Sequence, residues 1–233
     1  LYGLDRFSED MDFCLVVPDP DFSFQPYLQP VADELARYGF VARLEEKRAG
    51  PAVSVGSAFV KLETLRGLLV IERGGRRLPK GQLIKIRLEV DKRNPPGAEF
   101  AKKLVRLPEP FMVATLSEPS LFAGKLHALI ARSYLDRVKG RDYYDFLFYV
   151  ARDTPVNLVY LESKLRDSGH YDGSADLSRG ELVNLLKRKF ATVDFGKARS
   201  DVRPFLRAAK IPALAEWGPE LFGAMAEGLT VAE

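Results

Sequence analysis

The 233-residue sequence is poor in cysteine and histidine, with one Cys and two His. A single cysteine, Cys14, cannot build a disulfide framework, and it offers no basis for a Cys-rich zinc site. Two histidines without a partner pattern also give poor support for a Ser-His-Asp hydrolase. No apolar run approaches the length of a membrane span, and the first residues do not resemble a signal peptide. We therefore expect a cytoplasmic protein without a membrane partner.

The overall composition is that of a globular protein, with 46% hydrophobic and 29% charged residues. The chain is long enough to bury a core in one large domain or two small ones. Its net charge of +3 permits a polyanionic partner without requiring one. The sequence begins on Leu1 rather than Met, in mid-pattern, so we expect further sequence upstream.

The first half of the chain alternates strand-like and helix-like segments. A short apolar run at 13–17, followed by Pro18 and Pro20, indicates a buried strand. Alternating apolar and charged residues over 82–91 predict a strand with one charged face. The other elements expected in this half are a helix at 24–38 and strands at 40–46, 52–62, 68–72 and 111–116.

The pattern becomes helical from Glu118 onward. The break near 116–119 predicts an α/β part over 1–116 and a helical part over 117–233. The fold class is therefore α+β, a mixed sheet with helices followed by a C-terminal helical bundle. The helices expected in the second part are 119–134, 142–151, 158–168, 179–190, 202–209 and 219–227.

An acid cluster lies at the start of the first strand, in the stretch RFSEDMDF. Asp10 and Asp12 are two residues apart, so on a strand both side chains point to one side. Carboxylate oxygens suit Mg²⁺ or Mn²⁺. One of Glu89 and Asp91, on the charged face of 82–91, would complete a three-carboxylate cluster if the two strands pair. The alternative for the aspartates is a solvated strand end or a helix cap, and the alternative for Glu89 and Asp91 is a solvated edge strand with alternating charges.

A second group of charges lies in the stretch KLHALIARSYLDRVKGRDYYDF. Lys125 and Arg132 are seven residues apart and share one face of a helix. Asp142 and Asp145 are near the start of the next helix, where negative charge is favourable. The four residues predict either a salt-bridge clamp between the helices or a phosphate site. In the phosphate site, Lys125 contacts a nucleotide phosphate and Asp142 orients the lysine.

Four remaining features have less specific interpretations. We expect His127 to pack in or near the core and His170, in a Gly/Asp/Ser loop, to be solvated. The basic runs at 73–80 and 186–197 either contact RNA phosphates or form solvated faces.

Taken in order, LYGLDRFSEDMDF, IKIRLEVDKRNPPG and KLHALIARSYLDRVKGRDYYDFLFYV resemble the AbiEii/AbiGii toxin family of nucleotidyltransferases. This family is a branch of the DNA polymerase β-like superfamily, and the resemblance covers roughly the first 150 residues. It implies a polymerase β-like mixed sheet. It also implies metal-dependent transfer of an NMP from an NTP to an acceptor such as a tRNA 3′ end. Such a protein acts as a growth-inhibiting toxin of a toxin–antitoxin or phage-defence system, with a cognate antitoxin.

The resemblance also assigns roles to individual residues. Asp10 and Asp12 correspond to the metal-binding pair, and Glu89 is the third acid, with Asp91 as the alternative. The cofactor is Mg²⁺ or Mn²⁺. The implied catalytic residues are Asp10, Asp12, Glu89, Lys125 and Asp142, and the implied nucleotide contacts are Ser8, Lys125, Arg132, Arg141 and Asp145.

One feature of the superfamily is not found in this sequence. A Gly-Gly or Gly-Ser motif is expected roughly ten residues before the first acid, where its backbone amides bind the triphosphate. Here nine residues precede Asp10, and the only glycine among them is Gly3. Either the motif lies on sequence upstream of Leu1, or the protein is a degenerate scaffold with a non-catalytic binding role. A third option keeps the enzyme but changes its acceptor to a protein or small-molecule hydroxyl. The sequence specifies neither the NTP nor the acceptor.

Overall fold

The computed structural model divides the chain into two compact units. The sheet unit comprises residues 8–94, and the helical unit combines residues 1–7 with 95–233. This division differs from the boundary expected near 116, because residues 1–7 and 95–116 belong to the helical unit. The structure describes residues 2–8, 10–47, 64–73, 84–93, 95–132 and 138–232.

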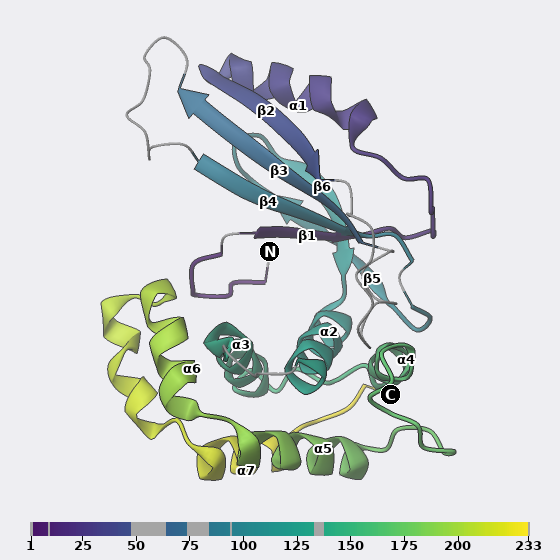
Figure 1. Ribbon diagram of the computed structural model, residues 1–233, viewed down its shortest axis with the longest axis vertical. Coiled ribbons are helices and arrows are strands. Elements are labelled where there is room, and N and C mark those ends of the chain that lie inside the picture. The colour runs from purple at the N-terminus through teal and green to yellow at the C-terminus, as the bar shows by residue number, and fades with distance from the viewer. Residues whose placement is uncertain are drawn as a thin grey trace. The chain divides into compact units, whose positions relative to one another are not determined.

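The sheet unit contains a four-stranded sheet with the order β1-β4-β3-β2 (Figure 1). Strand β1 pairs with β4 in parallel, whereas the other neighbours are antiparallel, so the predicted mixed sheet is confirmed. Helix α1 packs along the edge strand β2. The bounds are β1 Asp10–Cys14, α1 Gln25–Arg37, β2 Phe40–Lys47, β3 Thr64–Arg73 and β4 Ile84–Asp91.

The helix and strands predicted at 24–38, 40–46, 68–72 and 82–91 are present, with slightly different ends. The strand predicted at 52–62 lies outside the described residues. Gly39 follows α1 with φ of +78°, a conformation that glycine adopts without a steric penalty, so the chain can turn there into β2.

The prediction of a buried strand at 13–17 is wrong. Strand β1 ends at Cys14, and the side chains of Phe13 and Val17 are 47% and 75% exposed. Among the described strands, β1 lies at the edge of the sheet and has β4 as its single neighbour. The buried apolar residues of this sheet instead lie on the inner strands β3 and β4 and include Leu69, Val70, Ile71 and Val90.

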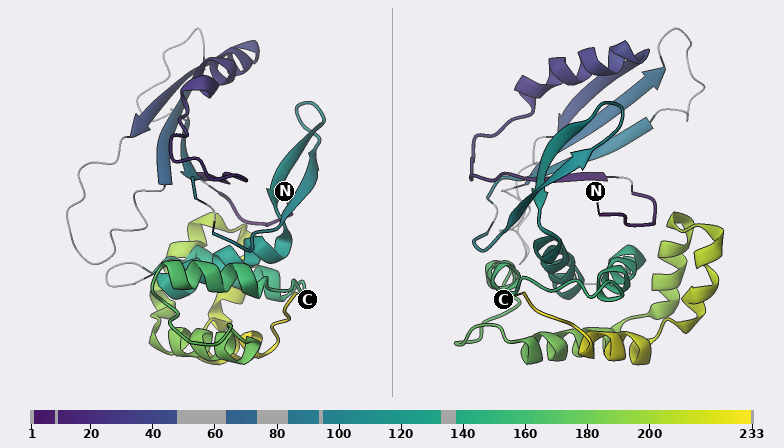
Figure 2. Two further views of the ribbon diagram at one scale, coloured as in Figure 1. Left: turned by 90° about the vertical axis from the view of Figure 1, so that its right-hand side faces the viewer. Right: turned by 180° about the vertical axis from the view of Figure 1, so that it is seen from behind.

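Within the helical unit, a two-stranded hairpin leads into the helices (Figure 2). Strand β6 was predicted, whereas β5 was not, because its sequence FAKKLV does not alternate clearly. The elements are β5 Phe100–Val105, β6 Phe111–Leu116, α2 Glu118–Ala131, α3 Gly140–Val150, α4 Leu158–Asp167, α5 Arg179–Thr192, α6 Phe195–Val202 and α7 Pro219–Glu227.

Most of the predicted helices are confirmed, but the helix predicted at 202–209 is wrong. Helix α6 covers Phe195–Val202 instead and is followed by short 3₁₀ turns. The Asp194 side chain accepts a hydrogen bond from the Lys197 N–H and starts α6. Pro204 has no N–H to donate, so the regular helix ends before it.

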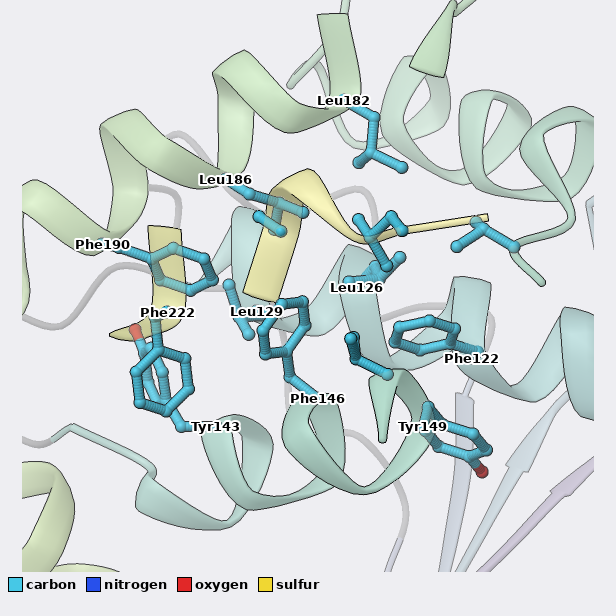
Figure 3. Packing of buried hydrophobic residues seen from close by; sticks show 14 of the residues in the cluster. Phe122, Leu126, Leu129, Tyr143, Phe146, Tyr149, Leu182, Leu186, Phe190 and Phe222 are labelled. Atoms are coloured by element: carbon cyan, nitrogen blue, oxygen red, sulfur yellow. The ribbon is translucent and has the colours of Figure 1, made fainter. Parts of the chain in front are cut away.

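An aromatic core holds the helices of this unit together (Figure 3). The ring centroids of Phe146 and Phe190 are 5.3 Å apart, and those of Phe190 and Phe222 are also 5.3 Å apart. Tyr143 meets Phe222 edge-on at 5.6 Å. Such contacts add directional packing to the burial of apolar area. This core fixes α3 and, through Phe122, also α2, and these two helices carry the predicted phosphate-binding residues.

No helix in the described ranges has both the length and the apolar character needed to cross a membrane.

Candidate functional site

The acids of the sheet unit lie on one face of the β1–β4 ladder. In this parallel pairing, Asp12 lies opposite Glu89, Asp10 opposite Arg87, and Cys14 opposite Asp91. Side chains of directly paired residues point to the same side of a sheet. The predicted strand pairing is therefore present, and Asp10, Asp12, Glu89 and Asp91 share a face.

These carboxylates do not converge into the predicted three-acid cluster. The Oδ1 atom of Asp10 is 3.6 Å from Nε of Arg87, and Oε1 of Glu89 is 3.2 Å from Nε of Arg66 on β3. Each of these two acids thus has an arginine as its neighbour. Among the residues that the structure describes, no three acidic, histidine or cysteine side chains are close enough to hold a metal ion. The metal-binding roles of the four acids stay predictions.

Asp10 nevertheless has a feature that suits a cation. Its Oδ1 atom is buried and accepts no hydrogen bond from any described residue. A buried carboxylate oxygen without a hydrogen bond is costly, and the ion pair with Arg87 is longer than a hydrogen bond. A divalent cation would satisfy that oxygen. Asp12, exposed on the same face, offers a second hard oxygen ligand, so the residues present fit Mg²⁺ or Mn²⁺.

The charged residues of the helical unit centre on Asp145 of α3, whose side chain is fully buried. Its Oδ1 accepts a hydrogen bond from Nε of Arg6 at 2.6 Å, and its Oδ2 accepts one from Nη2 at 2.7 Å. Nζ of Lys125 on α2 lies 3.0 Å from Oδ2. The sequence predicted the proximity of Lys125 and Asp145 but missed Arg6. Arg6 stands in the RFSEDMDF stretch, but no local pattern links it to an acid 139 residues away.

A second ion pair joins the same two helices. Arg132, which follows α2, donates from Nη1 to Oδ2 of Asp142 on α3. Together with the contact between Lys125 and Asp145, this confirms the interpretation as a salt-bridge clamp between helices. The role of these residues toward a nucleotide phosphate stays a prediction.

Further cations surround this pair. Burial lowers the pKa of Lys139, and the positive charge of Arg132 lowers it further. Lys189 of α5 donates to the backbone carbonyls of Ile130 and Arg132, where α2 ends. Burial lowers its pKa as well. The described surroundings of Asp142 are therefore rich in positive charge.

Two other predicted nucleotide contacts are placed less favourably. Arg141 is largely buried, and its guanidinium stacks over the ring of Phe205 at 4.1 Å from the centroid. Ser8 is exposed just before β1. Nucleotide contact by either residue stays a prediction.

Gly140 sets the position of α3 against α6. A Cβ atom at this residue would lie 1.9 Å from the carbonyl oxygen of Ala198, so only glycine fits. The Gly140 N–H donates to Oδ2 of Asp201 at 3.0 Å, which satisfies one of the free amides at the start of the helix. The close contact at Gly140 thus fixes the start of α3, the helix that carries Asp142 and Asp145, against α6.

The N-terminal segment 2–7 is fixed to the helical unit by polar contacts. The Tyr144 hydroxyl donates to Oδ1 of Asp5 at 2.6 Å, and Nζ of Lys210 is 3.0 Å from Oδ2. The Phe7 N–H donates to the Phe205 carbonyl at 2.9 Å. The hydrogen bond from Tyr144 is the largest cause of the lowered pKa of Asp5.

Both histidines behave as expected from the sequence. Nε2 of His127 is 3.0 Å from Oγ of Ser168, and burial lowers the pKa of His127 to about 4. The positive charge of Lys164 lowers it further. His127 is therefore a neutral, packed residue at pH 7, and His170 is exposed.

The basic run at 186–197 has mixed roles. Lys189 is used at the end of α2, and Lys187 forms an ion pair with Glu227. Arg188 is exposed and lines a pocket of about 580 Å³ together with His170, Tyr171 and Asn184. Most of the other basic run, at 73–80, lies outside the described residues.

Comparison with known proteins agrees with the ordered motifs. A family model described as "Nucleotidyl transferase AbiEii toxin, Type IV TA system" matches residues 1–218. The match includes the acids of β1 and β4 and the charged residues of α2 and α3. It also extends beyond the first 150 residues into the C-terminal helices. A comparison with curated proteins finds no significant match. The chain belongs to the AbiEii family, the nucleotidyltransferase toxins of type IV toxin–antitoxin systems.

Proposed function

We propose that this chain transfers an NMP from an NTP to an RNA acceptor, a tRNA 3′ end, with Mg²⁺ or Mn²⁺ held by Asp10 and Asp12. The observation that carries this proposal is the pair of acids on one face of β1, with the buried Oδ1 of Asp10 accepting no hydrogen bond from the described residues. Glu89 lies opposite Asp12 and would have to leave its ion pair with Arg66 to act as the third acid of the proposed site.

The two acids and the metal have separate tasks. When bound, the cation lowers the pKa of the attacking hydroxyl and neutralises charge on the triphosphate. Asp10 is held in place by the β1–β4 ladder and by Arg87, so it supplies a fixed oxygen. Asp12 is more exposed and supplies the ligand on the solvent side.

Lys125 supplies positive charge for the triphosphate. The group formed by Arg6, Lys125 and Asp145 carries two positive charges and one negative charge, which leaves a net charge of +1. The Lys125 side chain is 33% exposed, whereas that of Arg6 is 6% exposed. The surplus charge is therefore accessible on Lys125, and a lysine ammonium is a suitable point charge for phosphate.

The proposal is tested by label transfer. The protein is incubated with each labelled NTP, Mg²⁺ and total tRNA, with and without a chelator. Asp12→Asn should lower the transfer rate by roughly a hundredfold or more, because a metal ligand is lost. Asp33→Asn, on α1 and bonded to Gln29, is the matched control and should transfer at the wild-type rate. Absence of transfer by wild type, or equal transfer by Asp12→Asn, would refute the proposal.

A second candidate is a non-catalytic binding role on the same scaffold. Arg87 and Arg66 lie 3.6 and 3.2 Å from Asp10 and Glu89, so protein cations already offset part of the acidic charge. Binding of tRNA without any transfer would favour this candidate. Transfer to a protein or small-molecule hydroxyl, tested by replacing tRNA in the same assay, would keep the enzyme but change its acceptor.

The toxin role has its own test. Expression of the wild-type chain should arrest bacterial growth, and the Asp12→Asn variant should not. Co-expression of a cognate antitoxin should restore growth. Equal growth arrest by both proteins would separate toxicity from the proposed transfer.

A further inference from the structure

The contact between Arg6 and Asp145 is a two-point contact in the interior of the helical unit. Nε and Nη2 of Arg6 donate to the two carboxylate oxygens at 2.6 and 2.7 Å. The side chains are 6% and 0% exposed. Paired donors of this kind fix the orientation of both groups. Removing one partner of a buried ion pair is destabilising, because the other charge then lacks full compensation.

Arg6 decides how much of the Lys125 charge is available to a ligand. Because both Asp145 oxygens are already bonded to Arg6, Lys125 shares only Oδ2, at 3.0 Å. Without Arg6, Lys125 would remain as a counter-ion 3.0 Å from Oδ2 of Asp145, and the pair would have no net charge. The ammonium group would then be held by Asp145 rather than presented to solvent.

Arg6 also lies between two other attachments of the N-terminal segment. Asp5 is bonded to Tyr144 and paired with Lys210, and Phe7 is bonded to the carbonyl of Phe205. The chain that leads to Asp10 and Asp12 therefore starts from a residue fixed to α3.

We propose that Arg6 is a positioning residue with two effects. It neutralises Asp145, which leaves the Lys125 charge free for a polyphosphate, and it anchors the segment that leads into β1. Arg6 itself does not touch the substrate. This inference rests on the proposed function, because Lys125 is taken as the phosphate-binding residue.

The charge effect is measured by calorimetric binding of inorganic triphosphate with Mg²⁺, a probe without base or sugar. Arg6→Gln should weaken triphosphate binding roughly tenfold, the size of one lost charge-assisted contact. Lys125→Gln removes the ammonium group itself and gives the lowest affinity expected in the series. Arg6→Lys keeps the charge and should stay within about threefold of wild type.

The double variant Arg6→Gln/Asp145→Asn gives the sharpest test. It removes both the arginine and the acid, so Lys125 regains its surplus charge. Binding should recover to within about threefold of wild type, whereas a purely structural role predicts binding no better than that of Arg6→Gln. Should Arg6→Gln fail to fold, Asp145→Asn alone should bind triphosphate at least as tightly as wild type. Weaker binding would overturn the charge effect.

The anchoring effect has a readout that needs no ligand. The Phe7 amide, bonded to the Phe205 carbonyl, should exchange its hydrogen at least about tenfold faster in Arg6→Gln. Arg152→Gln is the matched control, since it removes an exposed arginine–glutamate pair in the same unit. It should change neither exchange nor binding. An unchanged exchange rate of the Phe7 amide in Arg6→Gln would overturn the anchoring effect.

Wild-type protein that binds no triphosphate would overturn the proposed function and the charge effect, whereas the exchange result would still decide the anchoring effect.

Discussion

Asp12 on β1 lies directly opposite Glu89 on β4, and Glu89 forms an ion pair with Arg66 on β3. Two acids opposite each other on neighbouring strands repel, and Arg66 offsets part of this repulsion. A cation at the proposed site would be attracted by the same carboxylates. Arg66 and the cation should therefore compete for Glu89.

Arg66→Gln should raise the affinity for Mn²⁺ or Mg²⁺. A unit charge about 4 Å away interacts with about 1 kcal/mol in water, so the expected gain is about fivefold. Calorimetric titration of the full chain with each cation measures it. Arg37→Gln on α1 is the control, because it removes the same charge at the opposite side of the sheet, where α1 packs on β2. Weaker cation binding by Arg66→Gln would contradict the competition.

Gly140→Ala should destabilise the helical unit. The added Cβ would meet the carbonyl oxygen of Ala198 at 1.9 Å, so α3 and α6 must separate. We expect a loss of about 3 kcal/mol in the free energy of unfolding, measured by denaturant titration. Gly124→Ala, in α2, has no described atom within 4 Å of its Cβ and should stabilise by up to about 1 kcal/mol. Equal effects of the two changes would show that the close approach at Gly140 does not matter.

Stability should fall on acidification because of His127. Its pKa is about 4 in the folded protein and about 6.5 in the unfolded chain. Between these values the unfolded chain binds more protons, so the contribution is fully present above about pH 6.5 and is lost as pH falls to 4. The expected loss is on the order of 2–3 kcal/mol. His127→Gln should remove this part of the pH dependence, and His170→Gln should keep it. Urea unfolding from pH 7 to pH 4 measures the difference.

Local patterns predicted the elements better than their long-range contacts. The alternation of 82–91 identified β4 and its charged face because the pattern depends only on neighbouring residues. The partner of Arg6 could not be predicted in this way, because Asp145 is 139 residues away and is brought close by packing of the helices. The prediction that the strand at 13–17 is buried was wrong for a similar reason, since an apolar run does not reveal whether its strand lies at the edge of the sheet.

The basic run at 186–197 should separate into residues for stability and residues for RNA. Lys189→Gln removes the donor to the carbonyls of Ile130 and Arg132 and should lower the free energy of unfolding by about 1–2 kcal/mol. Arg188 is exposed, so Arg188→Gln should leave stability within about 0.5 kcal/mol. If this face contacts RNA, Arg188→Gln should weaken binding of total tRNA and reduce its salt dependence by about one ion. Filter binding at several salt concentrations measures both quantities. Unchanged tRNA binding by Arg188→Gln would assign this face of α5 to solvent and leave Lys189 as a purely structural residue.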